Sequence, residues 1–69
     1  MTWVDAEDIG IALFEKFSSI DPLTVRFIDL REKVLQLDDF DDDPNASNEP
    51  RLEAIQMAWY EERQEAQES

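Results

Sequence analysis

The sequence predicts a small all-α domain built from three helices. Three stretches repeat apolar residues at the three- and four-residue spacing of one helix face. Stretches rich in Pro, Asn and Asp separate them, and these residue types favour turns. We find no convincing pair of strands. The chain has 69 residues, which is enough for one domain over residues 1–69 and no more.

The first predicted helix is DAEDIGIALFEKF, which starts at Asp5. Ile9, Leu13 and Phe17 recur at intervals of four and form one apolar face. Asp5 can cap this helix, and the acids that follow it suit the positive end of a helix dipole. Gly10 costs the helix about 1 kcal/mol relative to Ala. The stretch SSIDP then ends the helix, and its Asp-Pro pair predicts a turn or a new helix start.

A second helix is predicted over about residues 29–37, with Leu30, Val34 and Leu37 on its inner face. Before it lies LTVRF, residues 23–27, which is short, β-branched and aromatic. This composition leaves two alternatives open, an extended segment or a single helical turn.

The third helix follows a loop that is rich in Pro and Asn. Ser47 or Asn48 is predicted to cap it, with Pro50 tolerated in its first turn. The helix should run to about Arg63, and the tail, residues 64–69, should fray. Its inner face holds Leu52, Ile55 and Trp59.

Composition excludes several classes of function. The chain has no Cys and no His, so a metal could bind only through oxygen ligands, which suits hard cations such as Ca²⁺, Mg²⁺, Mn²⁺ or ferrous iron. The net charge is −12, from 18 acidic and 6 basic residues. Because phosphate binding needs clustered Lys and Arg, nucleic acid is disfavoured as a partner. The charge also favours a monomer.

No apolar run approaches the length of a transmembrane helix, and the first residues lack the basic region of a signal peptide. We therefore expect a cytoplasmic protein without membrane contacts. Catalysis is not expected either, because acid–base work by paired carboxylates needs a dry pocket that raises one pKa. A surface loop on so small a domain offers no such pocket.

The stretch LDDFDDDPNASNEP concentrates negative charge, so we first compare it with the calcium-binding loop of an EF-hand. Asp39, Asp41 and Asp43 match the first, third and fifth positions of that calcium loop. The sixth position needs Gly and holds Pro44, and the twelfth needs a bidentate Glu and holds Pro50. These two mismatches exclude a calcium hand.

Three alternatives stay open for this stretch: a solvated loop, a looser oxygen-ligand metal site, and a docking surface for a basic partner. Phe40 is expected to be a packing residue that anchors the run to the core. Trp3 and Trp59 are expected in the core or at its edge. If the start of the first helix lies beside this loop, the two would form one negative surface that steers a basic partner.

Four segments together resemble the IscX family, the small acidic proteins of bacterial iron–sulfur cluster assembly. They are W-x-D near the start, I-G-x-A-L, DPLTVRFIDL and LDDFDDDPNASNE. The resemblance covers Trp3 to about Trp59. It implies a winged-helix-like fold, weak and exchangeable binding of ferrous iron by surface carboxylates, and binding to the cysteine desulfurase IscS near the frataxin site. It also implies iron-dependent modulation of sulfur delivery.

The resemblance places both functions on acidic side chains. The implied metal and docking residues are Asp5, Asp8, Asp38, Asp39, Asp41, Asp42 and Asp43, and Glu49 joins the docking surface. Two features depart from the family pattern. Ile11 and Ala12 stand where members can carry another acid, so the loop is the safer site for iron. Ile28 stands where a capping Thr is common, so Asp29 or a shifted helix start must replace it.

The resulting hypothesis is a regulatory adaptor that senses ferrous iron and holds no cluster of its own. The alternative is an iron donor or chaperone that supplies ferrous iron to the cluster assembly scaffold. Because the chain lacks Cys and His, both hypotheses fit better than a cluster-carrying scaffold.

Overall fold

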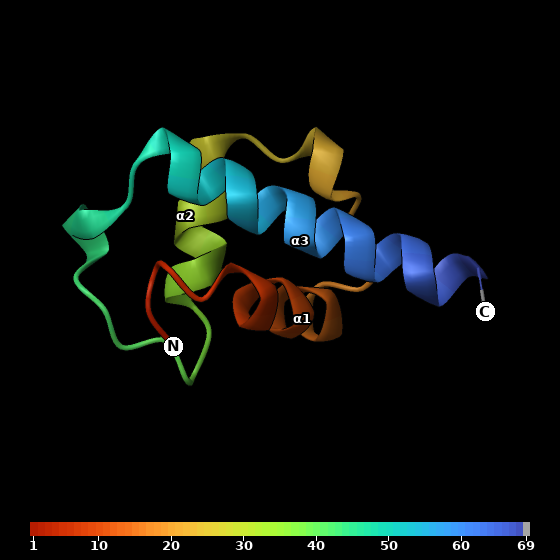
Figure 1. The fold of residues 1–69 in the computed structure, drawn as a ribbon, viewed down its shortest axis with the longest axis horizontal. Helices are drawn as coiled ribbons and strands as arrows, with labels where there is room; N and C mark the ends of the chain where they lie inside the picture. The colour runs from red at the N-terminus through yellow and green to blue at the C-terminus, as the bar shows by residue number, and fades with distance from the viewer. Residues whose placement is uncertain (69) are drawn as a thin grey trace.

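The computed structural model describes residues 1–68 and confirms an all-α domain with three helices. The elements are α1 (Ala6–Lys16), the 3₁₀ turn η1 (Pro22–Thr24), α2 (Phe27–Leu35), the 3₁₀ turn η2 (Pro44–Ala46) and α3 (Glu49–Glu68). Figure 1 shows α3 as a long rod, with α1 beside it and α2 near its N-terminal half. Within the described residues no strand is present. The winged-helix likeness stays a prediction.

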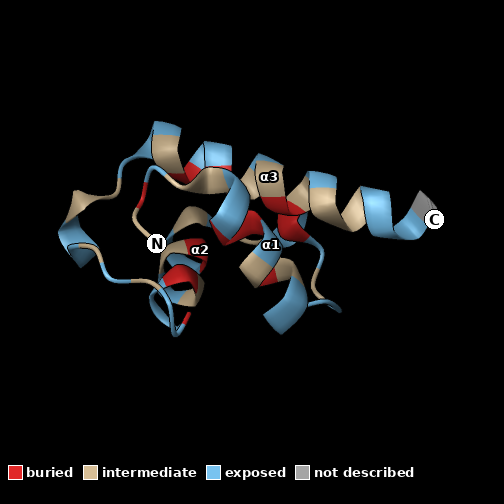
Figure 2. Ribbon diagram, turned by 60° about the horizontal axis from the view of Figure 1, so that its bottom comes forward, coloured by how far each residue is buried: buried red, intermediate tan, exposed pale blue. Residues whose placement is uncertain are grey.

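The three helices close over a single apolar core (Figure 2). Its buried members are Trp3, Ile9, Leu13, Leu30, Val34, Leu37, Leu52, Ile55 and Trp59. All three predicted inner faces are therefore confirmed, and both tryptophans are core residues. Phe17 is half-buried at the core edge, where its ring centre lies 6.4 Å from that of Trp59.

Gly10 lies at a close contact between α1 and α3. A Cβ atom at this position would lie 2.8 Å from the carbonyl carbon and the Cβ of Ala58, and 2.8 Å from the nitrogen of Trp59. Two of these atoms are backbone atoms, so they cannot move without shifting the helix. The glycine that weakens α1 as an isolated helix is thus what allows α3 to approach.

We expect Gly10→Ala to destabilise the domain by about 1–2 kcal/mol. Overpacking a tight core costs about 1–3 kcal/mol. The gain in helix propensity returns at most about 1 kcal/mol. Urea unfolding followed by circular dichroism measures the difference. A variant more stable than the wild type would show that propensity outweighs the helix contact.

The segment before α2 combines both alternatives left open by the sequence. Leu23 belongs to the single 3₁₀ turn η1, and Val25 and Arg26 are extended. Because Arg26 already has the extended backbone of an N-cap residue, α2 begins at Phe27 and not at the predicted residue 29. No side chain caps the helix, so a shifted start replaces the capping residue that Ile28 cannot supply.

The predicted end of α2 at residue 37 is also wrong. The Gln36 N–H is shared between the carbonyls of Glu32 and Lys33, at 3.2 Å each, and the Leu37 N–H donates to the Val34 carbonyl at 3.0 Å. This 3₁₀ tightening ends the helix at Leu35. Leu37 still belongs to the core and is buried.

The predicted caps differ in outcome. Asn48 caps α3 by accepting from the Arg51 N–H at 2.9 Å, and Pro50 lies in the first turn as predicted. Asp5 is the N-cap residue of α1, but its side chain makes no capping bond. Its Oδ2 accepts instead from the Thr2 N–H at 2.9 Å, so it closes the turn that precedes the helix.

Helix α3 continues beyond the predicted end at Arg63 and reaches Glu68. Residues 64–68 are Gln, Glu and Ala, all good helix formers, and no Gly or Pro interrupts them. Fraying of this tail in solution stays a prediction, and Ser69 lies outside the described residues. In the part of the chain that the structure describes, no helix combines the length and apolar character that crossing a membrane requires.

Candidate functional site

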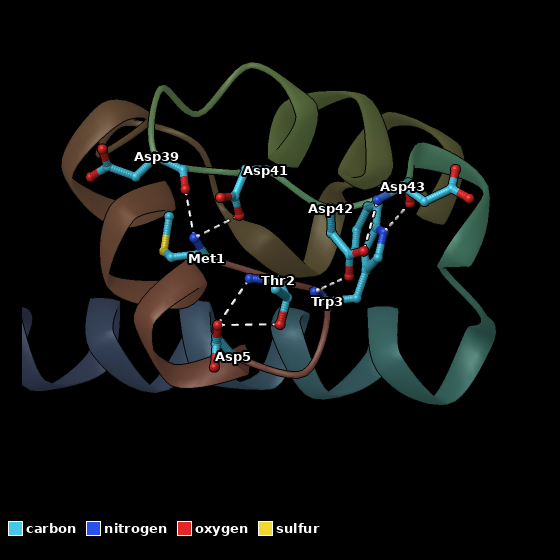
Figure 3. Close-up of polar contacts among 8 residues, drawn as sticks. All are labelled: Met1, Thr2, Trp3, Asp5, Asp39, Asp41, Asp42 and Asp43. Atoms are coloured by element: carbon cyan, nitrogen blue, oxygen red, sulfur yellow. Dashed lines mark hydrogen bonds and ion pairs between the residues drawn. The ribbon is translucent and has the colours of Figure 1, made fainter.

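The acidic loop, residues 38–43, lies against the first residues of the chain (Figure 3). The terminal ammonium group of Met1 donates to the Asp39 carbonyl at 2.6 Å and lies 3.5 Å from Asp41 Oδ1. The Asp41 N–H donates back to the Met1 carbonyl at 3.0 Å. The loop backbone is therefore paired with the N-terminal segment over several residues.

Trp3 ties the same loop to the core. Its backbone N–H donates to Asp42 Oδ2 at 3.1 Å, and its indole Nε1–H donates to the Asp43 carbonyl at 2.7 Å. The Phe40 ring meets the Trp3 ring edge-on, with centres 4.6 Å apart. Phe40 is thus a packing residue, as predicted, and it holds the loop to a tryptophan that is 1% exposed.

Two arginines hold the segment that follows the acidic loop. Arg31 of α2 donates from Nε to the Pro44 carbonyl at 3.0 Å, and Arg51 of α3 donates from Nη1 to the Ala46 carbonyl at 2.9 Å. The Asp43 side chain accepts from the Asn45 N–H at 2.9 Å and starts η2. Hydrogen bonds therefore hold the chain from Asp39 to Ala46, while every carboxylate of the loop except that of the half-buried Asp42 belongs to an exposed residue.

Hydrogen bonds lower the pKa of Asp42 below its ordinary value of 3.8. The largest cause is the bond from the Trp3 backbone N–H, followed by the bond from the Asp43 N–H. Arg51 and the terminal ammonium group add to the effect, and partial desolvation opposes it. The charged form of Asp42 is the one that holds Trp3.

We expect the bond between Asp42 and Trp3 to weaken in acid. A carboxylate with a lowered folded pKa contributes its full stability above its unfolded pKa, and the contribution is lost as the pH falls through the folded value. The Trp3 amide resonance should therefore titrate with a midpoint below 3.8. NMR spectra recorded from about pH 6 down to about pH 2 measure it. A midpoint above 3.8 would contradict this hydrogen-bond arrangement.

The carboxylates are not neutralised from within. Among the described residues, the one ion pair joins the terminal ammonium group to Asp41, whose side chain is 81% exposed. Lys16 donates to the main-chain carbonyl of Gln36 at 3.0 Å, and Arg31 and Arg51 also donate to main-chain carbonyls. Because these three cations donate to backbone oxygens, they leave the negative charge of the surface available to an external cation.

The structure divides the predicted acidic residues into separate groups. Asp38 and Asp39 line an open hollow of about 290 Å³, and Glu15 and Lys16 of α1 form its other wall. Nothing in the sequence singled out Glu15, because an acid on the outer face of a helix is common. The hollow brings it beside the loop.

The predicted residues on α1 lie apart from this hollow. Asp5 and Asp8 line a different hollow at the start of α1, together with Glu7. Figure 3 shows the first residues of the chain between Asp5 and the loop carboxylates. Glu49 is exposed in the first turn of α3.

A ready-made metal centre is not found in the described part of the chain. Within it, no three His, Cys, Asp or Glu residues are grouped in a way that could hold a metal ion. Both oxygens of Asp42 and one of Asp43 already accept from backbone N–H groups. Carboxylate oxygens are suitable ligands for ferrous iron, but the carboxylates of the described residues are not grouped as a metal site.

The family model described as iron-sulphur cluster assembly, which is the IscX family, matches residues 1–64. The chain belongs to this family. It is also similar to the uncharacterized protein PA3808 of Pseudomonas aeruginosa, with 49% identity over 63 residues. That match covers 91% of this chain and 96% of the relative. The IscX resemblance is therefore confirmed, and iron–sulfur cluster assembly is the process in which this IscX-family protein takes part.

Proposed function

We propose that this protein is a regulatory adaptor of iron–sulfur cluster assembly. It binds the cysteine desulfurase IscS through its acidic surface, binds ferrous iron weakly, and modulates sulfur delivery in an iron-dependent way. One observation carries the proposal: the loop carboxylates stand on a backbone fixed by hydrogen bonds and have no side-chain cation as partner among the described residues.

Docking follows from that arrangement. A surface of one sign steers a partner of the opposite sign and raises the association rate at low salt. Because contacts with Met1 and Trp3 already order the loop, and Arg31 and Arg51 hold the segment after it, little further backbone entropy is lost when a partner binds. The proposed docking residues are the acids of the loop, with Glu15 beside them and Asp5, Asp8 and Glu49 at the periphery.

Iron binding is proposed at carboxylates that are free to move. Asp38, Asp39 and Glu15 share a hollow, and their side chains make no hydrogen bond within the described residues. A ferrous ion there would need these carboxylates to converge, and the free energy spent on ordering them favours weak, exchangeable binding. Bound iron lowers the negative charge of the surface and so changes its attraction for a basic partner.

The second candidate is an iron donor that hands ferrous iron to the assembly scaffold. The free carboxylates of the hollow support it as well. It predicts iron transfer at a useful rate without the desulfurase present. The adaptor is favoured because a chain without Cys and His can bind iron only through oxygen ligands, and such weak binding suits a sensor better than a carrier.

We further propose a non-catalytic, monomeric protein that acts in the cytoplasm and binds neither nucleic acid nor membranes. The net charge of −12 supports the monomer and the lack of nucleic-acid and membrane binding, since it opposes self-association and approach to phosphate groups.

Desulfurase turnover tests the adaptor function. Sulfide release by purified IscS is measured as this protein is added, first without and then with ferrous iron, at fixed ionic strength. We expect the concentration that gives half of the effect to shift with iron. An effect that is identical with and without iron would contradict iron sensing, and scaffold loading without IscS would favour the donor.

A further inference from the structure

The outer side of α1 combines exposed apolar side chains with free carboxylates. Val4 and Ile11 are 69% and 39% exposed, and neither belongs to the described core or to the half-buried residues that pack against it. Val4 lies in one hollow with Glu7 and Asp8 at the start of the helix. In Figure 1, α3 runs along one side of α1, and no further helix covers the opposite side. Within the described residues, these two apolar side chains are therefore left outside the packed interior.

Acids surround Ile11 on the surface of the helix. Glu7 and Asp8 lie one turn before it and Glu15 lies one turn after it, at spacings of three and four residues that bring side chains together on a helix. All three acids are exposed, and in the described part of the chain none of them forms an ion pair. We call Val4, Glu7, Asp8, Ile11 and Glu15 the α1 face.

The α1 face continues into the surface proposed for docking. Glu15, at its far end, shares a hollow with Asp38 and Asp39 of the acidic loop. A partner that lies across the loop can therefore reach α1 as well. Because every charged residue of the α1 face is an acid, that partner must present cations here.

The composition of the α1 face indicates the chemistry of its occupant. Protein interfaces commonly bury an apolar centre inside a polar rim. Lys and Arg can pair with the acids of such a rim while their aliphatic stems lie over the apolar surface. A second copy of the chain would bring the same acids, and the anionic headgroups of a membrane would be repelled as well. A basic protein segment with an apolar side chain among its cations fits both parts of the face.

We propose that the α1 face binds such a basic segment of the partner, with Ile11 as its apolar anchor and Val4 as a second apolar contact. The inference rests on the proposed function and deepens it, because it adds an apolar contact to an otherwise acidic docking surface. The carboxylates attract the partner, and the anchor contributes affinity that salt does not screen.

Ile11→Glu distinguishes an apolar anchor from attraction by charge, because the two predict opposite changes. Charge alone would strengthen binding to immobilised IscS by up to about fivefold, since the variant adds an acid to an acidic face. The anchor predicts binding that is at least about fivefold weaker, because the apolar contact is lost and a charge is buried in its place. Affinity that is unchanged or higher would overturn the anchor.

Ile28→Glu is the matched control on another helix. Ile28 is 68% exposed on α2, so the same substitution adds the same charge away from the α1 face. We expect this control to bind IscS within about twofold of the wild type. Equal weakening in both variants would overturn the assignment to α1. Val4→Glu, which precedes the helix, should also weaken binding, and it decides the proposal if Ile11→Glu does not fold by circular dichroism.

Failure of the anchor differs from failure of the proposed function. If the wild type binds IscS and Ile11→Glu binds at least as tightly, the adaptor stands and the anchor is overturned. If the wild type does not bind IscS, the proposed function and the anchor are both overturned. Weaker binding of Ile11→Glu, with normal binding of Ile28→Glu, would support the anchor.

Discussion

Replacing Asp39, Asp41 and Asp43 together by Asn is expected to weaken binding to IscS roughly tenfold at low salt. Exposed charge pairs contribute about 0.2–1 kcal/mol each, and three of them at about 0.5 kcal/mol sum to roughly a factor of ten in affinity. Binding of the triple variant to immobilised desulfurase measures the loss. The fold should survive, because the amide that replaces the Asp43 carboxylate keeps an oxygen that can accept from the Asn45 N–H and continue to start η2.

A second triple variant separates the loop from the net charge. Glu53, Glu61 and Glu65 are exposed on α3, so their replacement by Gln removes the same charge elsewhere on the surface. We expect this control to bind IscS within about twofold of the wild type, since exposed charges away from the contact are screened. Equal losses in both variants would mean that total charge attracts the partner. Unchanged affinity in the loop variant would rule out the loop as the docking face.

Trp3→Ala is expected to leave the domain largely unfolded at about 25 °C. Truncating a buried Trp costs about 3–5 kcal/mol. A core of this size supplies a net stability of about 3–5 kcal/mol. Trp3 is 1% exposed and also holds Phe40 and the Asp43 carbonyl, so its loss releases the acidic loop as well. Far-UV circular dichroism and urea unfolding measure the effect.

Trp3→Phe distinguishes packing from hydrogen bonding at the same site. It keeps an aromatic ring against Phe40 and removes the indole N–H that donates to the Asp43 carbonyl. We expect a loss of about 1 kcal/mol, with the fold retained. A Trp3→Ala variant that unfolds near the wild-type urea midpoint would show that the N-terminal segment is not part of the cooperative core.

The helix faces could be predicted because periodicity is a local property of the chain. Spacing alone predicts that Leu30, Val34 and Leu37 face inward, and all three are buried. The ends of α2 could not be predicted, because they depend on the extended backbone of Arg26 and on the Gln36 N–H, which is shared between two carbonyls. Neither feature is indicated by a particular residue type in the sequence.

Contacts between distant segments lay beyond the sequence. The bonds from Trp3 to Asp42 and Asp43 join residues about forty positions apart, and no local pattern marks them. The contact between α1 and α3 does have a local signal, the isolated Gly10 inside a helical pattern. An unfavourable residue in a helix often permits the close approach of a neighbouring segment. No sequence pattern distinguishes Glu15, and only the fold brings it to the loop.

The acidic residues of the candidate site could be predicted from composition and from the family resemblance. The absence of Cys and His limits any metal to oxygen ligands, and only the resemblance implies iron and the desulfurase. The structure adds the reason that the charge is available: Arg31 and Arg51 donate to carbonyl oxygens, so among the described residues neither forms an ion pair with a carboxylate of the loop.

The most direct test of the central claim is the affinity of the wild-type chain for purified IscS at low and moderate salt, with and without ferrous iron. Docking through the acidic surface predicts binding that weakens as salt rises and that shifts when iron is added. An affinity that neither salt nor iron changes, or an absence of binding under all four conditions, would contradict the proposed adaptor.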